Sequence, residues 1–413
     1  MNESKPRSFS RGEAFRKSLT SRYRIASGWR TIFFSALVIA MISLAALLYN
    51  VVDGAFGYVA FEYKNDPAEF TTKPLDDLNQ QELLAVLKAN LSAGAYKKLD
   101  NEQPMESRSK EVLYTLVLER LVQVDTKQNW SMTDSILNGN RIKAEVAEKY
   151  PEAKLEFRSW LTPVFLTTPM SSKAEFAGVR TAILGSLWMV GIAILFALPI
   201  GTGAAIYLQE YATKNFLNRI IQTNINNLAG VPSIVYGMLG LAIFVRALEP
   251  FTSGSMFGIT DTNGRTILSA GLTMGVLVLP LIIINGQEAI KAVPDSLRQA
   301  AYGVGATRWQ TIWHHVLPNA LPGILTGSIL AVSRAIGETA PLIIVGASTF
   351  ISLDPEGPFS KFTALPIQIY QWTTRAQTEF HSIAASAIIV LLVLLLTLNA
   401  TAVIIRNRVQ RKY

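Results

Sequence analysis

Apolar residues are clustered along the chain into long runs, and these runs set the predicted architecture. A transmembrane helix needs about 20 predominantly apolar residues. By this measure we place spans, in chain order, at residues 31–52, 179–207, 220–245, 266–285, 321–348 and 383–405. The pattern therefore predicts an all-α polytopic membrane protein with six transmembrane helices.

The segment between the first two predicted spans, residues 53–178, has a different pattern. Charges of both signs are mixed through it, and none of its apolar runs is long enough to span. Residues 76–91 and 108–123 place leucine and valine at helical spacing, which predicts two amphipathic helices. We therefore expect a mostly helical extracytoplasmic insertion, and its many carboxylates indicate a solvated surface.

Basic residues flank the apolar runs and predict the orientation. The formal net charge is +8, and much of it lies in two short tails, residues 1–30 and 406–413. The positive-inside rule places such tails in the cytoplasm. The first apolar run, residues 31–52, is longer than the roughly 7–15 residues of a signal-peptide core, and no clear A-x-A cleavage site follows. We interpret it as an uncleaved anchor.

The composition excludes several kinds of site. Cysteine is absent, so disulfides and thiolate chemistry are excluded, and three histidines are too few for a His-rich metal site. No P-loop, G-x-S-x-G or H-E-x-x-H pattern occurs. We expect no catalytic, metal-binding or cofactor-binding residues. Trp309 and Trp313 beside Arg308 are more typical of a membrane boundary or protein interface than of base stacking, so we expect no nucleic-acid partner.

A polar loop, residues 286–320, separates the fourth and fifth predicted spans. Residues 296–304 predict a short helix, and Gly305 allows the left-handed backbone of a turn. A second short helix follows, with Trp309, Ile312, Trp313 and Val316 at helical spacing. We expect Leu317 and Pro318 to end it, because proline disfavours helix in the preceding residue. Such a helix–turn–helix suits docking into a cleft of another protein.

Two charged residues interrupt the fifth predicted span. Arg334 is unfavourable there by about 2.5–3.5 kcal/mol on insertion scales, and Glu338 adds to the cost. The two residues are four apart and can touch on one helical face. Small residues precede them, at Gly323, Gly327 and Ala331, and would admit another helix closely. Pro341 can bend the helix. The pair either locks the bundle or lines a path for an anion, which a guanidinium suits.

The 286–320 loop resembles the EAA loop of ABC-importer permeases. The matching residues are Gln299, Ala300, Ala301, Gly305, Leu317 and Pro318. Gln299 stands where the family has glutamate, and His315 stands where it has isoleucine. The resemblance implies that these six residues form the surface that couples the permease to its ATPase, with Gln299 leaving that position uncharged.

Two further phrases resemble the PstA family, permeases of phosphate-specific ABC importers. They are LAGVPSIVYG at residues 228–237 and SRAIGETAP at residues 333–341, and the match covers about 179–405. The resemblance implies an ABC importer type I permease core at 179–405, with a coupling loop at 286–320. It also implies inorganic phosphate as substrate, a bacterial inner (plasma) membrane location and a periplasmic insertion. Arg334 and Glu338 would then belong to the substrate path.

The same resemblance implies the partners. They are an ATPase dimer of the PstB type, a second permease of the PstC type and a periplasmic phosphate-binding protein of the PstS type. ATP would be used by the partner ATPase, so this chain would not itself be an enzyme. Three alternatives stay open: a permease for another oxyanion, an ion-coupled secondary transporter or channel, and a membrane-anchored sensor. The secondary-transporter hypothesis explains the charged span but not the docking loop. The sensor hypothesis is disfavoured because the predicted cytoplasmic segments include no signalling domain.

Overall fold

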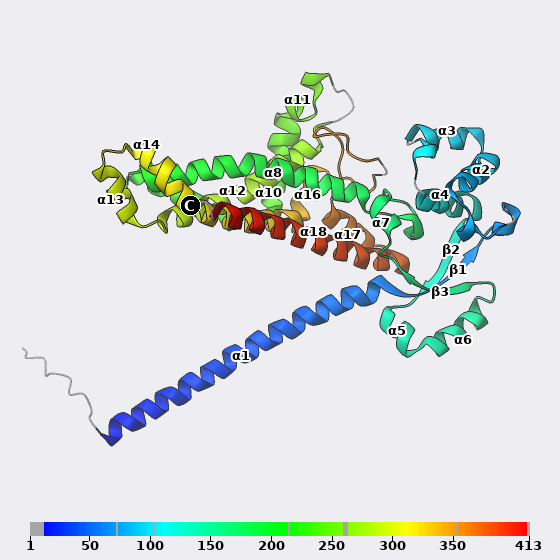
Figure 1. The fold of residues 1–413 in the computed structure, drawn as a ribbon, viewed down its shortest axis with the longest axis horizontal. Coiled ribbons are helices and arrows are strands. Elements are labelled where there is room, and N and C mark those ends of the chain that lie inside the picture. Colours follow the sequence, from blue (N-terminus) through cyan, green and yellow to red (C-terminus); the bar gives the residue numbers. More distant parts are fainter. Residues whose placement is uncertain are drawn as a thin grey trace, which may run out of the picture. The chain divides into compact units, whose positions relative to one another are not determined.

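The structure is a computed structural model that describes residues 12–71, 73–102, 104–108, 110–213, 215–258, 263–351 and 353–410. It divides into two units, Met1–Asp53 and Gly54–Tyr413. Helices dominate both (Figure 1). The described part of the first unit is almost entirely α1 (Glu13–Ala55), which begins within the segment predicted as a tail. Its large apolar side chains, such as Phe33, are exposed, as expected of a span that a bilayer surrounds.

Within the described residues, five helices are long and apolar enough to cross a membrane. They are α1, α8 (Arg180–Ile206) continued by η6 (Tyr207–Tyr211), α12 (Ile267–Lys291), the continuous helix of α14 (Arg308–Thr311), η9 (Ile312–Val316) and α15 (Leu317–Gly337), and α18 (Thr378–Gln410). The mostly helical, membrane-spanning architecture is confirmed. Whether the spans number five or six depends on one bent helix pair.

The bent pair lies where the third span was predicted, at residues 220–245. It consists of α9 (Phe216–Ala229) and α10 (Ser233–Gly240), which η7 (Leu241–Ala247) continues, and the bend is 105°. The break falls at Pro232, which cannot donate a backbone hydrogen bond to the carbonyl of Leu228. The span predicted at 220–245 therefore corresponds to two helix segments, which together can count as one broken span.

The fifth predicted span also differs. Its helix starts at Arg308 and passes through Leu317 and Pro318, so these two residues do not end it. The π-turn η9 has the N–H of Leu317 donating to the carbonyl of Ile312, and Pro318 then falls in the first turn of α15, where no donor is needed. The helix ends at Gly337, well before the predicted residue 348.

α12 is the centre of the bundle and packs against α8 and α15. A Cβ on Gly327 would lie 2.3 Å from Cβ of Asn285, and one on Gly323 would lie 2.7 Å from Cβ of Ala289. The predicted small-residue stripe therefore admits a neighbouring helix, α12. The stripe continues to buried Ala335, whereas Arg334 lies beside it and is exposed.

The insertion, residues 56–176, is built on a small antiparallel sheet. Strands β1 (Phe56–Tyr63), β2 (Val124–Asn129) and β3 (Lys154–Ser159) lie in the order β2-β1-β3. Around the sheet lie α2 (Gln80–Asn90), α3 (Ala93–Glu102), α4 (Lys110–Val117), η4 (Leu118–Val122), α5 (Met132–Leu137), α6 (Gly139–Lys149) and α7 (Pro163–Thr167). The two predicted amphipathic helices are confirmed as α2 and as α4 with η4. The sheet was not predicted, because charged residues on its strands hide the alternation.

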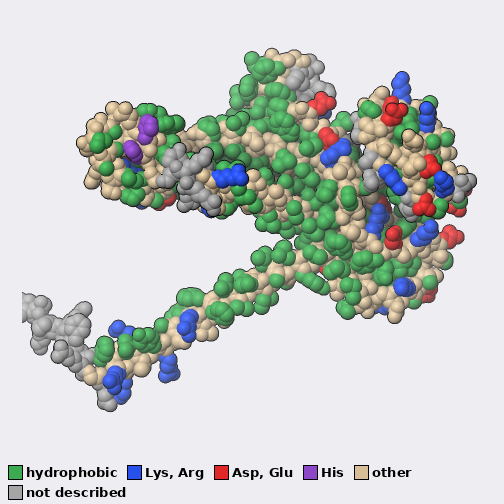
Figure 2. Space-filling model, viewed as in Figure 1, with side chains coloured by type: hydrophobic (Ala, Val, Ile, Leu, Met, Phe, Trp, Pro, Cys, Tyr) green, Lys and Arg blue, Asp and Glu red, His purple; other side chains and the backbone are tan. Residues whose placement is uncertain are grey.

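Charged side chains gather on the insertion, whereas hydrophobic side chains cover much of the helical bundle (Figure 2). The insertion nevertheless does not form a separate domain. Phe165 of α7 packs 6.1 Å, ring to ring, from Trp372 of α17 (Leu365–Thr373). Both rings belong to one buried cluster with Val59 of β1 and Ile383 of α18. The side-chain amide of Asn129 also donates to the hydroxyl of Ser382, near the start of α18. The insertion and the first turns of α18 are therefore packed together.

The shared core gives a stability prediction. We expect Phe165→Ala to destabilise the purified protein by about 3–5 kcal/mol, because it removes a buried aromatic ring. Phe157→Ala, which deletes the same ring at a residue that is 48% exposed, should have a much smaller effect. Thermal unfolding in detergent measures both. Equal melting temperatures for the two variants would contradict a core shared by insertion and bundle.

Candidate substrate path and coupling surface

Two helix breaks lie against each other in the bundle. The first is the turn at residues 230–232 between α9 and α10, and the second separates α15 from α16 (Ala340–Val345). A Cβ on Gly237 of α10 would lie 2.7 Å from Cα of Pro341, so only glycine permits this approach. In a continuous helix Pro341 would leave the carbonyl of Gly337 without a donor; the break places the proline in a first helical turn instead.

Tyr236 closes the first break. Its hydroxyl donates to the carbonyl of Leu228 over 2.7 Å, and the N–H of Val231 donates to the same carbonyl over 3.1 Å. These two donors replace the one that Pro232 lacks, so the carbonyl of Leu228 is satisfied within the chain. The Tyr236 side chain is buried. Arg334 lies in the last turn of α15, directly before the second break. The two breaks and the charged residue therefore form one region.

Arg334 and Glu338 meet as predicted. The Nε of Arg334 donates to Oε1 of Glu338 over 3.3 Å, from the last turn of α15 to the residue that caps it. The Arg334 side chain is 45% exposed and that of Glu338 is 18% exposed. Within the described residues, Arg334 makes no other ion pair. A guanidinium with one carboxylate contact and free donors can still bind an anion.

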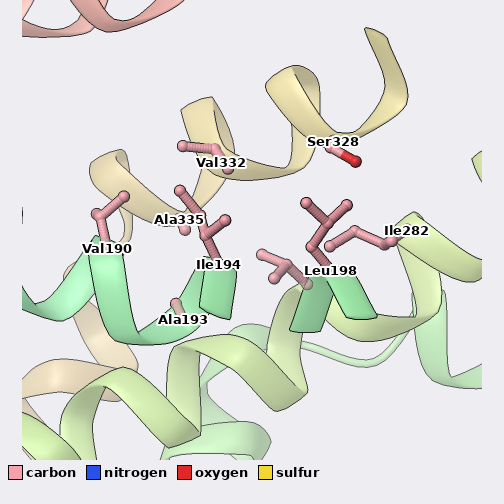
Figure 3. A pocket seen from close by; sticks show the side chains of 9 residues that line it. Val190, Ala193, Ile194, Leu198, Ile282, Ser328, Val332 and Ala335 are labelled. Carbon is pink, nitrogen blue, oxygen red and sulfur yellow. The ribbon is translucent and has the colours of Figure 1, made fainter. Parts of the chain in front are cut away.

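The enclosed cavity of the bundle is not such a site. It lies between α8, α12 and α15, and side chains such as Val190, Ile194 and Leu198 point into it (Figure 3). Its volume is about 10 Å³, close to the minimum for one water molecule. The hydroxyl of Ser328, at its edge, already donates to the carbonyl of Ile324. An oxyanion has neither room nor polar partners there.

The coupling loop adopts the predicted helix–turn–helix. α13 (Asp295–Gly303) is the first short helix, Gly305 has φ 83°, and α14 with η9 forms the second. Gln299 and Ala300 are exposed and Ala301 is buried, whereas Leu317 and Pro318 are partly buried within the following helix. Val304 follows the last residue of α13 and is exposed.

An apolar and aromatic surface covers the outside of this loop. Trp309 and Trp313 stack with ring centroids 5.4 Å apart. Leu297, Tyr302 and Val304 of the same loop are exposed as well. Exposed aromatic residues at a protein surface are typical of an interface with another protein.

Arg298 holds this surface to the bundle, and sequence reasoning did not identify it. Its guanidinium donates to Oε1 of Glu210 in η6 over 2.8 Å and to the backbone carbonyls of Ile290 and Val293. The side chains of Arg298 and Glu210 are 14% and 8% exposed. Arg298 thus joins α13 to the ends of α8 and α12. Its place directly before Gln299 was the available signal, but nothing in the sequence indicates a partner 88 residues away.

These features together define a polytopic membrane permease: apolar spans, two paired helix breaks with a half-exposed arginine, and a docking surface between spans. The chain belongs to the family described as "Binding-protein-dependent transport system inner membrane component", which matches residues 197–412. It is therefore a multi-pass inner-membrane permease of an ABC transporter.

Three relatives carry the likeness further. The chain is 36% identical over 234 residues to the phosphate transport system permease protein PstA 1 of Mycobacterium tuberculosis, covering 56% of this chain and 72% of the relative. It is 32% identical over 256 residues to the probable ABC transporter permease protein YqgI of Bacillus subtilis, covering 59% and 83%. It is 32% identical over 229 residues to PstA of Yersinia pestis, covering 55% and 72%.

The Arg298 contacts give a matched pair of variants. Glu210→Gln removes the buried carboxylate, and we expect it to destabilise the protein by about 3–5 kcal/mol, because the arginine keeps its charge without a buried partner. Asp295→Asn also replaces a carboxylate that contacts Arg298 by an amide, but the side chain of Asp295 is 87% exposed. We expect it to change stability by about 0–1 kcal/mol. Denaturation of the purified protein compares them; equal losses would contradict the assignment of Glu210 as the anchor.

Proposed function

We propose that this chain is a permease subunit of an ATP-driven ABC importer that moves inorganic phosphate into the cell. The observation that carries the proposal is the half-exposed Arg334, held beside two broken helices in a family of transport permeases. Ionisable residues inside membranes face the bundle interior or a watery cavity and mark ion or substrate pathways. The names of the relatives from Mycobacterium and Yersinia support phosphate as the anion.

Phosphate suits this position chemically. It is a tetrahedral oxyanion, and a guanidinium presents a planar fork of donors that matches two of its oxygens. Glu338 holds one edge of that fork through Nε and leaves the other donors free. A single cation that is half exposed would attract the anion without trapping it in a dry, closed site. Another oxyanion of the same charge remains the nearest alternative substrate.

The coupling loop favours an ATP-driven importer over an ion-coupled secondary transporter. Its exposed tryptophans, Trp309 and Trp313, offer a docking surface that a secondary transporter has no use for. We assign Gln299, Ala300, Ala301, Gly305, Leu317 and Pro318 to that coupling region. The exposed ones would touch the ATPase, and Ala301, Leu317 and Pro318 would support them from within.

The proposal extends to partners and topology. The partners are an ATPase dimer of the PstB type, a second permease of the PstC type and a periplasmic binding protein of the PstS type, all assembled in the lipid bilayer. ATP is used by the ATPase, and this chain needs no cofactor, no metal and no nucleic acid. Both termini and the coupling loop lie in the cytoplasm, and the insertion lies in the periplasm, where it is positioned to receive the binding protein.

Charge removal tests the substrate path. We expect Arg334→Gln to abolish most uptake of labelled phosphate in cells at unchanged membrane level, because the anion loses its fixed positive partner. Arg334→Lys keeps the charge but not the planar fork of donors, so its phosphate uptake should lie between that of the wild type and that of Arg334→Gln. Glu338→Gln should be milder. Lys149→Gln, which removes an exposed positive charge from the insertion, is the control and should transport normally.

Full phosphate uptake by Arg334→Gln at normal protein level would overturn the anion-path assignment. Loss of membrane-inserted protein in Arg334→Gln, with Arg334→Lys unaffected, would instead assign the pair to locking the bundle. Uptake of labelled sulfate in parallel separates phosphate from another oxyanion.

The turn at Gly305 tests coupling. Its φ of 83° disfavours any residue with a Cβ, although the space around it is open. We expect Gly305→Glu to reduce ATP-dependent uptake strongly, since it strains the turn and places a charge on the docking surface. Gly305→Asn tolerates the left-handed backbone and adds no charge, so it should retain most activity. Normal uptake and normal co-purification of the ATPase with Gly305→Glu would remove this loop from the coupling mechanism.

A further inference from the structure

α9 is amphipathic, and its apolar face is uncovered. Phe216 is 77% exposed and Leu217 is 62% exposed, and Ile220, Ile221 and Leu228 on the same face are exposed as well. The opposite face carries Asn218, Arg219, Gln222, Thr223 and Asn226, and Asn227 lies at the edge of the apolar face. Asn224 falls among the apolar residues and donates its amide to the carbonyl of Ile220 instead of to water. A helix of this pattern is typical of a membrane interface.

The depth of α9 follows from its contact with α12. Gln222 and Gln287 exchange two side-chain hydrogen bonds, of 2.8 and 3.2 Å. Directly after Gln287 come Glu288 and Lys291, whose side chains are more than half exposed. Exposed charges of this kind stay out of the hydrocarbon. Gln287 therefore marks the level at which α12 leaves the bilayer core, and α9 is hydrogen-bonded at that level.

The direction of α9 follows from its length and its bend. It has 14 residues and is about 21 Å long, too short to cross a hydrocarbon core of about 30 Å. It meets α10 and η7 at 105°, so it runs nearly perpendicular to a helix that enters the bundle. Tyr236 and the break at Pro232 fix that bend.

We propose that α9 lies flat in the cytoplasmic interface of the bilayer as a membrane-surface helix, with phospholipid as its occupant. Its apolar face rests on the acyl chains, and its polar face lies among the headgroups and water. Arg219 then lies at the level of the lipid phosphates, which complement its charge. The choice of the cytoplasmic side rests on the proposed function, which places the coupling loop in the cytoplasm.

Lipid is favoured over a second protein subunit as the occupant. The exposed apolar residues lie at the boundary depth, where acyl chains are available, and the polar residues form a continuous face on the other side. A subunit that covered the apolar face would still leave the polar face in hydrocarbon if α9 crossed the bilayer. Only if α9 lies flat can its apolar face contact acyl chains while its polar face contacts headgroups and water.

Spin labels on single cysteines test the orientation, since the native chain has no cysteine. We would label Leu217→Cys, Ile221→Cys, Leu228→Cys, Thr223→Cys and Asn226→Cys, each in the full chain assembled with its partners in nanodiscs of phosphatidylethanolamine and phosphatidylglycerol. Collision with oxygen and with a water-soluble nickel chelate reports depth. Cysteines at Val393, Leu396 and Ile404 of α18 provide the control, because a spanning helix gives a steady depth gradient.

We expect the three apolar positions to show one similar, shallow depth and preferential oxygen access, and the two polar positions to show chelate access. A depth that rises steadily from Leu217 to Leu228, as in α18, would overturn the proposal. So would apolar positions shielded from both reagents in the complex, which would identify a protein as the occupant.

An Arg308→Cys variant, labelled in intact cells and in inverted vesicles, assigns the side independently. Labelling of Arg308→Cys from outside the cell would refute the proposed topology, and with it the cytoplasmic placement of α9. The depth pattern of α9 itself is measured without any reference to phosphate transport, so it stands or falls separately from the proposed substrate.

Discussion

Backbone hydrogen bonding around prolines is the constraint on which the central region of this permease depends. A proline within a helix removes one backbone donor, and the carbonyl that it leaves needs another partner. The structure accommodates Pro232, Pro341 and Pro318 in three different ways. At Pro232 the hydroxyl of Tyr236 reaches back to Leu228. At Pro341 the helix ends and restarts, and at Pro318 a π-turn precedes the proline. The first two solutions interrupt helices side by side, which is where Arg334 lies.

The arginine lies next to those interruptions. An arginine packed among apolar neighbours would carry a large desolvation penalty. Arg334, in the last turn of α15, is instead half exposed with one carboxylate partner. The close approach of Gly237 to Pro341 then keeps the two interrupted spans together. The proposed anion-binding residue and the two helix breaks therefore lie together in this region.

Different interactions stabilise the two ends of the bundle. At the coupling loop a buried ion pair, Arg298 with Glu210, joins α13 to the end of α8, and backbone carbonyls of α12 satisfy the remaining donors. At the insertion the tie is apolar, with Phe165 and Trp372 in one cluster. A movement of either attached element must therefore be accompanied by α8 or α18, which run through the bundle.

The sequence by itself determined what depends on local composition: the apolar runs, the turn at Gly305, the two short helices around it and the contact of Arg334 with Glu338. These follow from periodicity and from spacing of four residues or less along the chain. The break at Pro232, the partner of Arg298 and the sheet of the insertion were decided only by the tertiary structure. The partner of Arg298 and the strand pairing of the sheet depend on groups far apart in sequence. At Pro232 the groups are close in sequence, but only the folded bend brings the hydroxyl of Tyr236 to the carbonyl of Leu228.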